Sequence, residues 1–267
     1  TSVEYFPKRT QLIQNDKAKG KFVWQAEGFG TVADTGVEFK FPSGDEVSVS
    51  FGARKPWSPT HADWGPGGPA TFVPLAPMFW YVDSIGTPVT YRIKLANGTI
   101  REGRGFAHVE KNWGKIFPRA WMWLQAVSPE NDAAVALAGG PLGIYPLELT
   151  AYFVGYKSKA VNMDIRPDQL SIYSTEIRPE RGYFRMEAKN LRDRLVIEAQ
   201  ADPRSFAPVS IPTKEGYRPN GGIESFGAEI TVKAYRMGKL LETKTFRGGA
   251  LEFGADNMGK EKGPRQD

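Results

Sequence analysis

The chain has 267 residues, of which 40% are hydrophobic and 24% are charged, and it contains no cysteine. The absence of cysteine excludes thiol nucleophiles, disulfides and cysteine-based metal sites. The net charge of +5 comes from interleaved basic and acidic residues without the basic stripe of a nucleic-acid binder, and no apolar run approaches the roughly 20 residues of a membrane-spanning helix. We therefore expect no nucleic-acid partner and no transmembrane segment.

Short runs in which apolar and polar residues alternate follow one another along the chain, and turn residues separate them. The 29 glycines and 20 prolines supply many of those turns, among them the strong turn dipeptide Asn97-Gly98. No stretch of ten or more residues has the period of an amphipathic helix. The sequence therefore predicts an all-β protein with little helix, an antiparallel sandwich or barrel. The expected strands are residues 22–29, 36–41, 46–51, 78–83, 87–95, 99–112, 120–125, 133–138, 147–156, 159–164, 169–173, 182–188, 194–199, 228–235, 239–246 and 250–253.

Residues 54–77 interrupt this pattern with dense proline and glycine, and they also carry Trp57, His61, Asp63 and Trp64. A long irregular segment that bears aromatic side chains within a compact domain is usually functional or disordered. We expect the lid or rim of a cavity here, and a plain surface loop is the alternative.

Residues 104–126 hold three of the seven tryptophans, and we expect them to form a strand, a loop and a second strand. Side chains of a strand alternate between its two faces. Two groups of large aromatic and proton-exchanging side chains therefore share a face: Phe106, His108 and Glu110 on the first strand, and Trp121, Trp123 and Gln125 on the second. Such a mixture is typical of a ligand cavity, although tryptophan is also common in ordinary sheet packing.

If this face is a site, three of its side chains are the candidate catalytic groups. Glu110, partly desolvated among tryptophans, would have a raised pKa and serve as a proton donor. His108 and Gln125 would donate hydrogen bonds to the substrate or protonate it. The residues expected to bind substrate are Trp80, Tyr81, Phe106, Trp113, Arg119, Trp121 and Trp123.

The sequence indicates neither a metal site nor a cofactor. Two distant histidines and the lack of a carboxylate cluster at ligand spacing leave no ligand set for a metal. A P-loop, a glycine-rich dinucleotide motif and a nucleophile elbow are also missing. We therefore expect a cofactor-free protein whose partner is a hydrophobic small molecule.

Residues 105–114 (GFAHVEKNWG), Phe117-Pro118 and residues 121–125 (WMWLQ) resemble the signature of tocopherol-cyclase-like proteins. Residues 221–254 are similar to the C-terminal strands of that family. The resemblance implies an antiparallel lipocalin-like fold with two β halves and a hydrophobic pocket. Members of the wider group are cofactor-free cyclases, including fungal Diels-Alderases and hetero-Diels-Alderases, and carotenoid hydratases.

The resemblance implies a cofactor-independent cyclase of the Diels-Alder or hetero-Diels-Alder type in natural-product biosynthesis. Its substrate would be a lipophilic terpenoid, polyene or quinone-methide-like molecule. Two alternatives stay open at this point. One is the proton-driven, chroman-forming reaction of a tocopherol cyclase, and the other is a lipocalin-type carrier that binds a hydrophobic ligand without turnover.

The expected organisation is an N-terminal β half over residues 1–126, a C-terminal β half over residues 127–258 and a disordered tail over residues 259–267. The sequon that begins at Asn97 is compatible with a secretory or vesicular location after removal of a leader. The cytoplasm is the open alternative.

Overall fold

The computed structural model describes residues 3–16, 21–58, 60–61, 64–69, 78–114, 118–144, 147–213 and 215–258. Antiparallel strands dominate these residues, and the helical segments are 3-10 turns of three residues each. The all-β, antiparallel fold expected from the sequence is thus confirmed. No helix in the described part of the chain is long and apolar enough to cross a membrane. Asp63, Phe117 and the tail over residues 259–267 lie outside the described residues.

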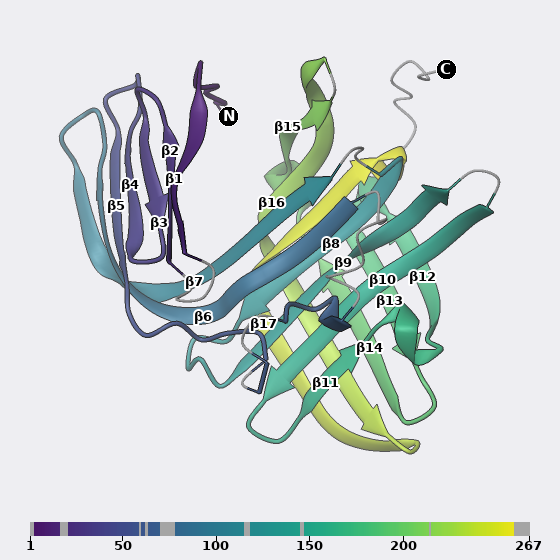
Figure 1. Ribbon diagram of the computed structural model, residues 1–267. Helices are drawn as coiled ribbons and strands as arrows, with labels where there is room; N and C mark the ends of the chain where they lie inside the picture. Colours follow the sequence, from purple (N-terminus) through teal and green to yellow (C-terminus); the bar gives the residue numbers. More distant parts are fainter. Residues whose placement is uncertain are drawn as a thin grey trace. The chain divides into compact units, whose positions relative to one another are not determined.

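The first sheet is a meander in which each strand pairs with the next one in sequence, in the order β1 to β7 (Figure 1). Tight turns around Gly44 and Gly98 connect β4 to β5 and β6 to β7, whereas residues 52–77 separate β5 from β6. Its strands are β1 (Thr10–Asp16), β2 (Lys21–Ala26), β3 (Gly30–Ala33), β4 (Gly36–Lys40), β5 (Glu46–Phe51), β6 (Met78–Lys94) and β7 (Ile100–Gly114).

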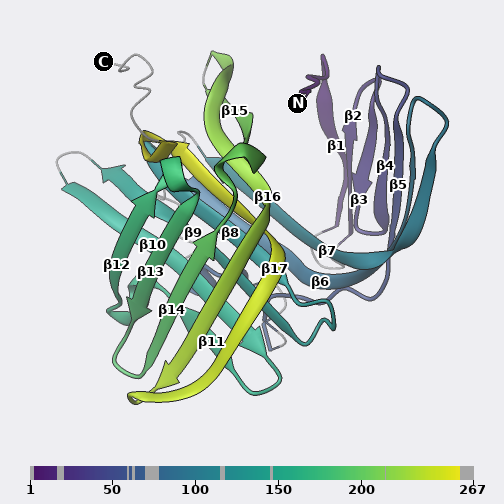
Figure 2. The same cartoon turned by 180° about the vertical axis from the view of Figure 1, so that it is seen from behind.

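Within the described part of the chain, the second sheet has ten strands, and its order includes one long-range insertion. The order is β11-β10-β9-β8-β17-β16-β14-β13-β12, with β15 paired to β16. The last strand of the chain, β17, therefore lies between β8 and β16, and the sheet curls as Figures 1 and 2 show. Its strands are β8 (Ala120–Val127), β9 (Ala133–Ile144), β10 (Leu147–Ser158), β11 (Asn162–Ile165), β12 (Ile172–Arg178), β13 (Tyr183–Lys189), β14 (Asp193–Gln200), β15 (Ala207–Thr213), β16 (Gly216–Arg236) and β17 (Lys239–Ala255).

One face of this curled sheet carries the hydrophobic core. On β8, Met122 and Leu124 are fully buried, and they lie opposite Phe253 and Leu251 of β17, which are equally buried. Alternate residues of the other strands add aliphatic and aromatic side chains to the same cluster. These side chains pack against one another in one buried cluster.

The packing divides the chain into two compact units. The smaller unit consists of Val3–Pro59 and Ser84–Val109, and the larger unit consists mainly of Thr60–Asp83 and Glu110–Asp267. Strands β6 and β7 contribute residues to both units. The boundary expected between residues 126 and 127 falls within β8 of the larger unit, and a division into separate halves at that point stays a prediction.

The described part of the irregular segment 54–77 includes a buried stretch in the larger unit. Residues 65–68, with the sequence Gly-Pro-Gly-Gly, are all buried. A Cβ on Gly65 would lie 2.9 Å from the ring of Tyr81, and one on Gly68, whose φ is +54°, would lie 2.7 Å from the guanidinium of Arg166. This part of the segment packs closely because it has almost no side chains. Its role as a lid or cavity rim stays a prediction.

Candidate functional site

Strands β8, β17 and β16 carry a row of aromatic and acidic side chains on the face opposite the core. Trp123 of β8 is paired with Glu252 of β17, and Glu252 is in turn paired with Glu224 of β16. Residues paired directly across antiparallel strands point to the same face. The neighbours of these residues, Leu124 and Leu251, belong to the core. The indole and the two carboxyl groups therefore point away from the packed interior.

Glu110 joins this row through two hydrogen bonds from tryptophan. The Nε1 atoms of Trp80, on β6, and of Trp123 both donate to Glu110 Oε2, each at 2.9 Å. An indole N–H only donates, and a carboxylate only accepts, so the pairing suits both groups. The structure thus brings together three residues that the sequence analysis had assigned to one site.

Trp121 holds the second carboxyl group. Its Nε1 donates to Glu252 Oε1 at 2.5 Å, and its side chain is only 7% exposed. The indole lies on Gly254 of β17, where an added Cβ would be 1.8 Å from the ring. Only glycine allows this approach, so Gly254 determines where the ring of Trp121 lies and how it meets Glu252.

The carboxyl groups of Glu224 and Glu252 have raised pKa values. Burial raises the pKa of Glu252 to about 7, the nearby charges of Glu224 and Glu110 add to the rise, and the bond from Trp121 opposes it. Burial, together with the charge of Glu110, raises the pKa of Glu224 to about 7. Desolvation and like charge both disfavour the ionised form of a carboxyl group. Near neutral pH, Glu224 and Glu252 therefore exchange protons.

We call the six residues of this site the carboxyl-indole cluster. It consists of Trp80, Glu110, Trp121, Trp123, Glu224 and Glu252. Among the residues that the structure describes, no group of three or more His, Cys, Asp or Glu side chains is placed to hold a metal ion.

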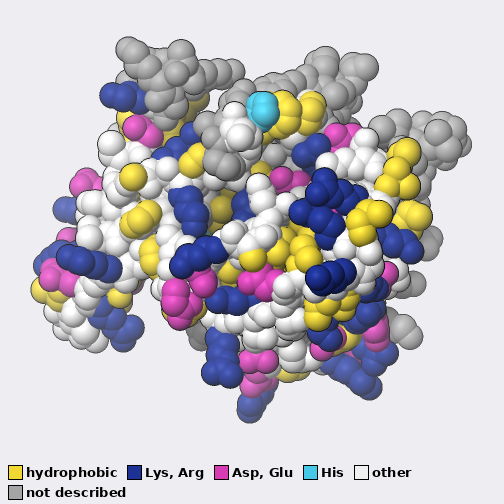
Figure 3. All heavy atoms as spheres, turned by 90° about the horizontal axis from the view of Figure 1, so that it is seen from below, with side chains coloured by type: hydrophobic (Ala, Val, Ile, Leu, Met, Phe, Trp, Pro, Cys, Tyr) yellow, Lys and Arg dark blue, Asp and Glu magenta, His cyan; other side chains and the backbone are white. Residues whose placement is uncertain are grey.

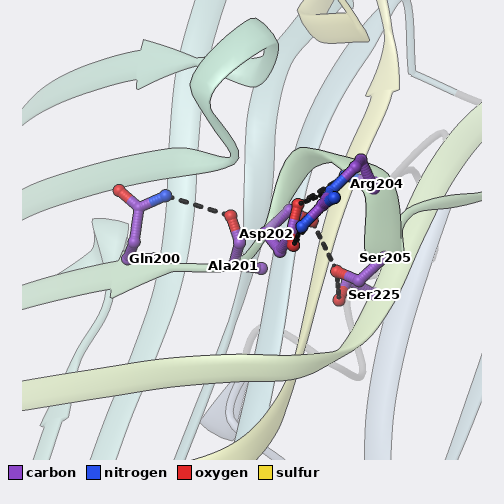
Figure 4. A network of polar contacts seen from close by, with 6 residues as sticks. All are labelled: Gln200, Ala201, Asp202, Arg204, Ser205 and Ser225. Atoms are coloured by element: carbon purple, nitrogen blue, oxygen red, sulfur yellow. Dashed lines mark hydrogen bonds and ion pairs between the residues drawn. The ribbon is translucent and has the colours of Figure 1, made fainter.

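Hydrogen bonds of Ser225, the residue that follows Glu224, anchor β16 next to the cluster. Ser225 is 1% exposed, and its hydroxyl shares a hydrogen bond of 2.7 Å with Ser205 Oγ and accepts one of 3.1 Å from the backbone N–H of Gly227. Ser205 Oγ also donates to the backbone oxygen of Asp202 at 2.6 Å (Figure 4). The register of β16 against β17 shifts just after Ser225. The network therefore holds the strand at its bulge and limits the positions that Glu224 can take.

The carboxylate of Asp202 completes this network through Arg204 (Figure 4). Its oxygens accept hydrogen bonds from the backbone N–H and the guanidinium of Arg204, at 2.7 to 3.2 Å. The side-chain bond from Arg204 is the main cause that lowers the pKa of Asp202 to about 2. Asp202 is thus a carboxylate held ionised, in contrast to Glu224 nearby.

Two other residues expected at the site lie on strands that carry cluster residues, Gln125 on β8 and Trp113 on β7. Gln125 is half-buried on the same face of β8, opposite Ala250. Trp113 is 39% exposed and stacks on Phe79 with ring centroids 5.2 Å apart. Their predicted roles in binding or catalysis stay predictions.

Four further candidates have different surroundings. Tyr81 is half-buried and lies against the backbone of the buried segment at Gly65. Arg119 is exposed and forms an ion pair with Asp256 at 3.3 Å. Phe106, which is 40% exposed, and the half-buried His108 lie on β7 in the smaller unit. The predicted roles of these four residues also stay predictions.

The sequence analysis missed Glu224 and Glu252, yet the sequence does hold a signal for both. Residues 221–228 read GGIESFGA and residues 248–255 read GGALEFGA. Each segment places a single glutamate in an otherwise apolar or small run between a glycine pair and Phe-Gly-Ala. A glutamate is rarely kept in such an apolar strand unless it has a partner or a function. The similarity of the two segments would have suggested that the glutamates belong together.

The sequence comparison defines the class of the protein. Residues 93–255 match the family model described as tocopherol cyclase-like, which covers more than half of the chain. The protein belongs to the tocopherol cyclase-like family, as its central motifs suggested. The match includes five of the six cluster residues and leaves out Trp80. A comparison with curated proteins gives no match.

Two solved structures are similar to this chain at low sequence identity. One is a protein of Nitrosomonas europaea described as an AttH, which is 13% identical, with a TM-score of 0.43 and coverage of 90% of this chain and 78% of the other. The second is kievitone hydratase from Nectria haematococca, which is 8% identical, with a TM-score of 0.45 and coverage of 82% of this chain. The alignment spans 64% of the hydratase chain, which is less than two thirds of its length.

Proposed function

We propose that the protein is a cofactor-independent cyclase that closes a ring on a lipophilic substrate by moving a proton within the carboxyl-indole cluster. The substrate class is terpenoid, polyene or quinone-methide-like, in keeping with the family. The observation that carries the proposal is the pair of facing glutamates, Glu224 and Glu252, each with a pKa raised to about 7 and placed beside three indoles.

Carboxyl groups with such pKa values can act as acid and base at neutral pH. General acid-base catalysis is most effective when the pKa of the group lies near the working pH. In the proposed reaction, one of the two glutamates transfers its proton to a carbon atom of an alkene in the substrate. A nucleophilic oxygen of the substrate then bonds to the resulting cationic carbon, and the proton of that oxygen passes to a carboxylate of the cluster. The substrate is isomerised, and no atom is gained or lost.

The indoles and Glu110 would stabilise the cation. The negative face of an indole attracts a positive charge within about 6 Å, and a preorganised carboxylate does so more strongly in a partly dry site. Trp80 and Trp123 hold Glu110 in a fixed orientation through their two hydrogen bonds. Trp121 orients Glu252 in the same way.

A concerted cycloaddition is the second candidate, and the three indoles favour it. Flat aromatic surfaces can hold a flexible apolar substrate in a folded, reactive shape, and orientation alone accelerates well-aligned reactions strongly. Such a reaction would use the same cluster but would not need a proton from Glu224 or Glu252.

Turnover in D2O separates the two reactions. The purified protein would be incubated with a prenylated phenol or quinone methide, and the ring product would be analysed by mass spectrometry. Proton-driven closure places one deuterium on carbon, whereas a cycloaddition places none. Product formation without deuterium would therefore overturn the acid-catalysed reaction, and binding without product would favour a carrier.

A pair of variants tests the assignment of the acid. Glu252→Gln keeps the shape of the side chain but removes its exchangeable proton, and we expect kcat to fall about 100-fold or more, within the usual range for a lost general acid. Glu229→Gln is the matched control, because Glu229 lies on β16 but is exposed and paired with Arg247. If Glu252→Gln turned over substrate as fast as the control Glu229→Gln, Glu252 would not be the acid.

A further inference from the structure

The turns at one end of the larger unit expose apolar side chains. Among the described residues, the three most exposed large hydrophobic side chains are Leu191, Leu170 and Met237, at 89%, 80% and 78%. Leu191 lies in the turn between β13 and β14, Met237 lies in the turn between β16 and β17, and Leu170 follows the 3-10 turn η2 (Pro167–Gln169). Isolated exposed leucines are ordinary, whereas three at neighbouring turns form a patch.

Hydrogen bonds place the three turns side by side. Asn190 Nδ2 donates to Gln169 Oε1 at 3.3 Å, which joins the first turn to the segment of Leu170. The backbone N–H of Met237 donates to the backbone oxygen of Arg192 at 2.8 Å, which joins the first turn to the third. The turns after β13 and β16 lie together at the lower end of Figure 1. We call residues 166–172, 189–194 and 236–241 the turn surface.

Two of the three exposed apolar residues have a backbone φ angle that is unusual for such residues. Met237 has a φ of +49° and Leu170 a φ of +55°, both in the left-handed region. A turn between two strands that needs this conformation usually takes asparagine or glycine. The chain thus places apolar side chains in water at positions where the backbone also disfavours them. Turn geometry therefore does not favour apolar residues at these two positions.

The turn surface is also basic. It carries six basic residues and two acidic ones, and both acids are paired within it, Asp168 with Arg166 at 3.0 Å and Asp193 with Arg236 at 2.7 Å. The exposed side chains of Lys189, Arg192 and Lys239 surround the apolar tips. Seen from below, Lys and Arg side chains lie between hydrophobic side chains on this face of the molecule (Figure 3).

We propose that the turn surface docks on an anionic lipid membrane. Leu170, Leu191 and Met237 would enter the boundary between headgroups and acyl chains, while the basic side chains would contact the lipid phosphates. A second copy of the chain fits less well, because a two-fold interface would place this basic surface against itself. The surface lies at the opposite end of β16 and β17 from Glu224 and Glu252, so it is separate from the carboxyl-indole cluster.

Vesicle binding by the full chain tests the proposal. The probes are vesicles of phosphatidylcholine with phosphatidylserine and vesicles of phosphatidylcholine alone, separated from free protein by sedimentation. We expect binding to the anionic vesicles that weakens as salt is added, because charge attraction is screened. The variant Leu170→Ser/Leu191→Ser/Met237→Ser should lose affinity by about tenfold or more, since each apolar side chain adds to binding through its buried area.

Two further variants complete the test. Arg192→Glu/Lys239→Glu should lose about tenfold for anionic vesicles, because each basic residue near the surface contributes to the attraction. The matched control Ile13→Ser/Ile100→Ser removes two exposed apolar side chains, 56% and 51% exposed, from the seven-stranded sheet and should bind like the parent. Circular dichroism would verify that every variant is folded.

Three results would overturn the proposal. One is a parent protein that does not bind anionic vesicles, and another is equal binding by the parent and both turn-surface variants. The third is a parent that self-associates by light scattering, with the triple serine variant monomeric and vesicle binding unchanged. That last result would assign the turn surface to contact between copies of this chain.

Discussion

The two faces of β8, β17 and β16 are built from the same strands but have opposite chemistry. On the core face, Leu124 and Leu251 are fully buried and interact only through packing. On the other face, Trp123, Glu252 and Glu224 are paired directly across the three strands and form a row of polar and aromatic groups. Burial of the core face stabilises the fold, whereas burial of Glu252 and Glu224 on the other face raises the pKa values of these carboxyl groups to about 7. The core face thus holds residues that stabilise the sheet, and the other face holds residues that can act on a ligand.

The largest expected effect comes from breaking the core face. Leu124→Ala removes a fully buried side chain, so we expect the free energy of unfolding to fall by about 2 to 5 kcal/mol, including the cavity that remains. Chemical denaturation followed by circular dichroism measures the loss. The pH dependence of stability should keep its slope, because the carboxyl groups lie on the other face.

The second effect comes from the contact between Gly254 and Trp121. Gly254→Ala adds a Cβ at 1.8 Å from the indole, which forces the ring away from Glu252. We expect a loss of about 3 kcal/mol, near the upper end for overpacking, together with a changed tryptophan fluorescence spectrum. Gly216→Ala is the control, because a Cβ there meets no atom within 4 Å, although its φ of +127° adds some strain. An unchanged spectrum for Gly254→Ala would contradict the described ring position.

The third effect is a pH dependence of the free energy of unfolding, which we attribute to Glu252 of the carboxyl-indole cluster. The folded protein raises the pKa of Glu252 from its ordinary 4.5 to about 7, so between these values the folded state binds more protons than the unfolded state. Stability from this group is present below about pH 4.5 and is lost as the pH rises to about 7. We expect a decrease on the order of 2 kcal/mol over that window, after allowance for solvent screening.

Glu252→Gln should flatten this part of the curve, because glutamine does not titrate. Denaturation measured at several pH values checks the difference between the two proteins. A slope that is the same in Glu252→Gln and in the parent would assign the titration to another group.

The smallest expected effect concerns the anchor beneath Glu224. Ser225→Ala removes the hydroxyl bonded to Ser205 and Gly227, and we expect a loss of about 1 kcal/mol, typical for one buried hydrogen-bonding group. The test is denaturation in parallel with Ser174→Ala, which alters an exposed serine of β12. If the loss were the same for both, Ser225 would not anchor the bulge.

The local alternation of side chains along the strands predicted part of the site. The alternation in residues 120–125 correctly placed Trp121 and Trp123 on one face and Met122 and Leu124 on the other. The same reasoning put Glu110 with Trp121 and Trp123, and in the structure Glu110 accepts a hydrogen bond from Trp123. Neither Glu224 nor Glu252 could be placed in this way, because strand pairing between distant parts of the chain brings both of them to the site.

The sequence by itself determined that the protein is an antiparallel β protein of the tocopherol cyclase-like family, and which side chains of each strand share a face. These properties follow from period-two alternation, turn residues and motifs, all of which are local. The tertiary structure alone decided which face is the core, and that β17 lies between β8 and β16. That pairing joins Trp121 to Glu252, 131 residues away, and so assembles the cluster. Pairing between strands so distant in sequence depends on the packing of the whole sheet, which no local pattern encodes.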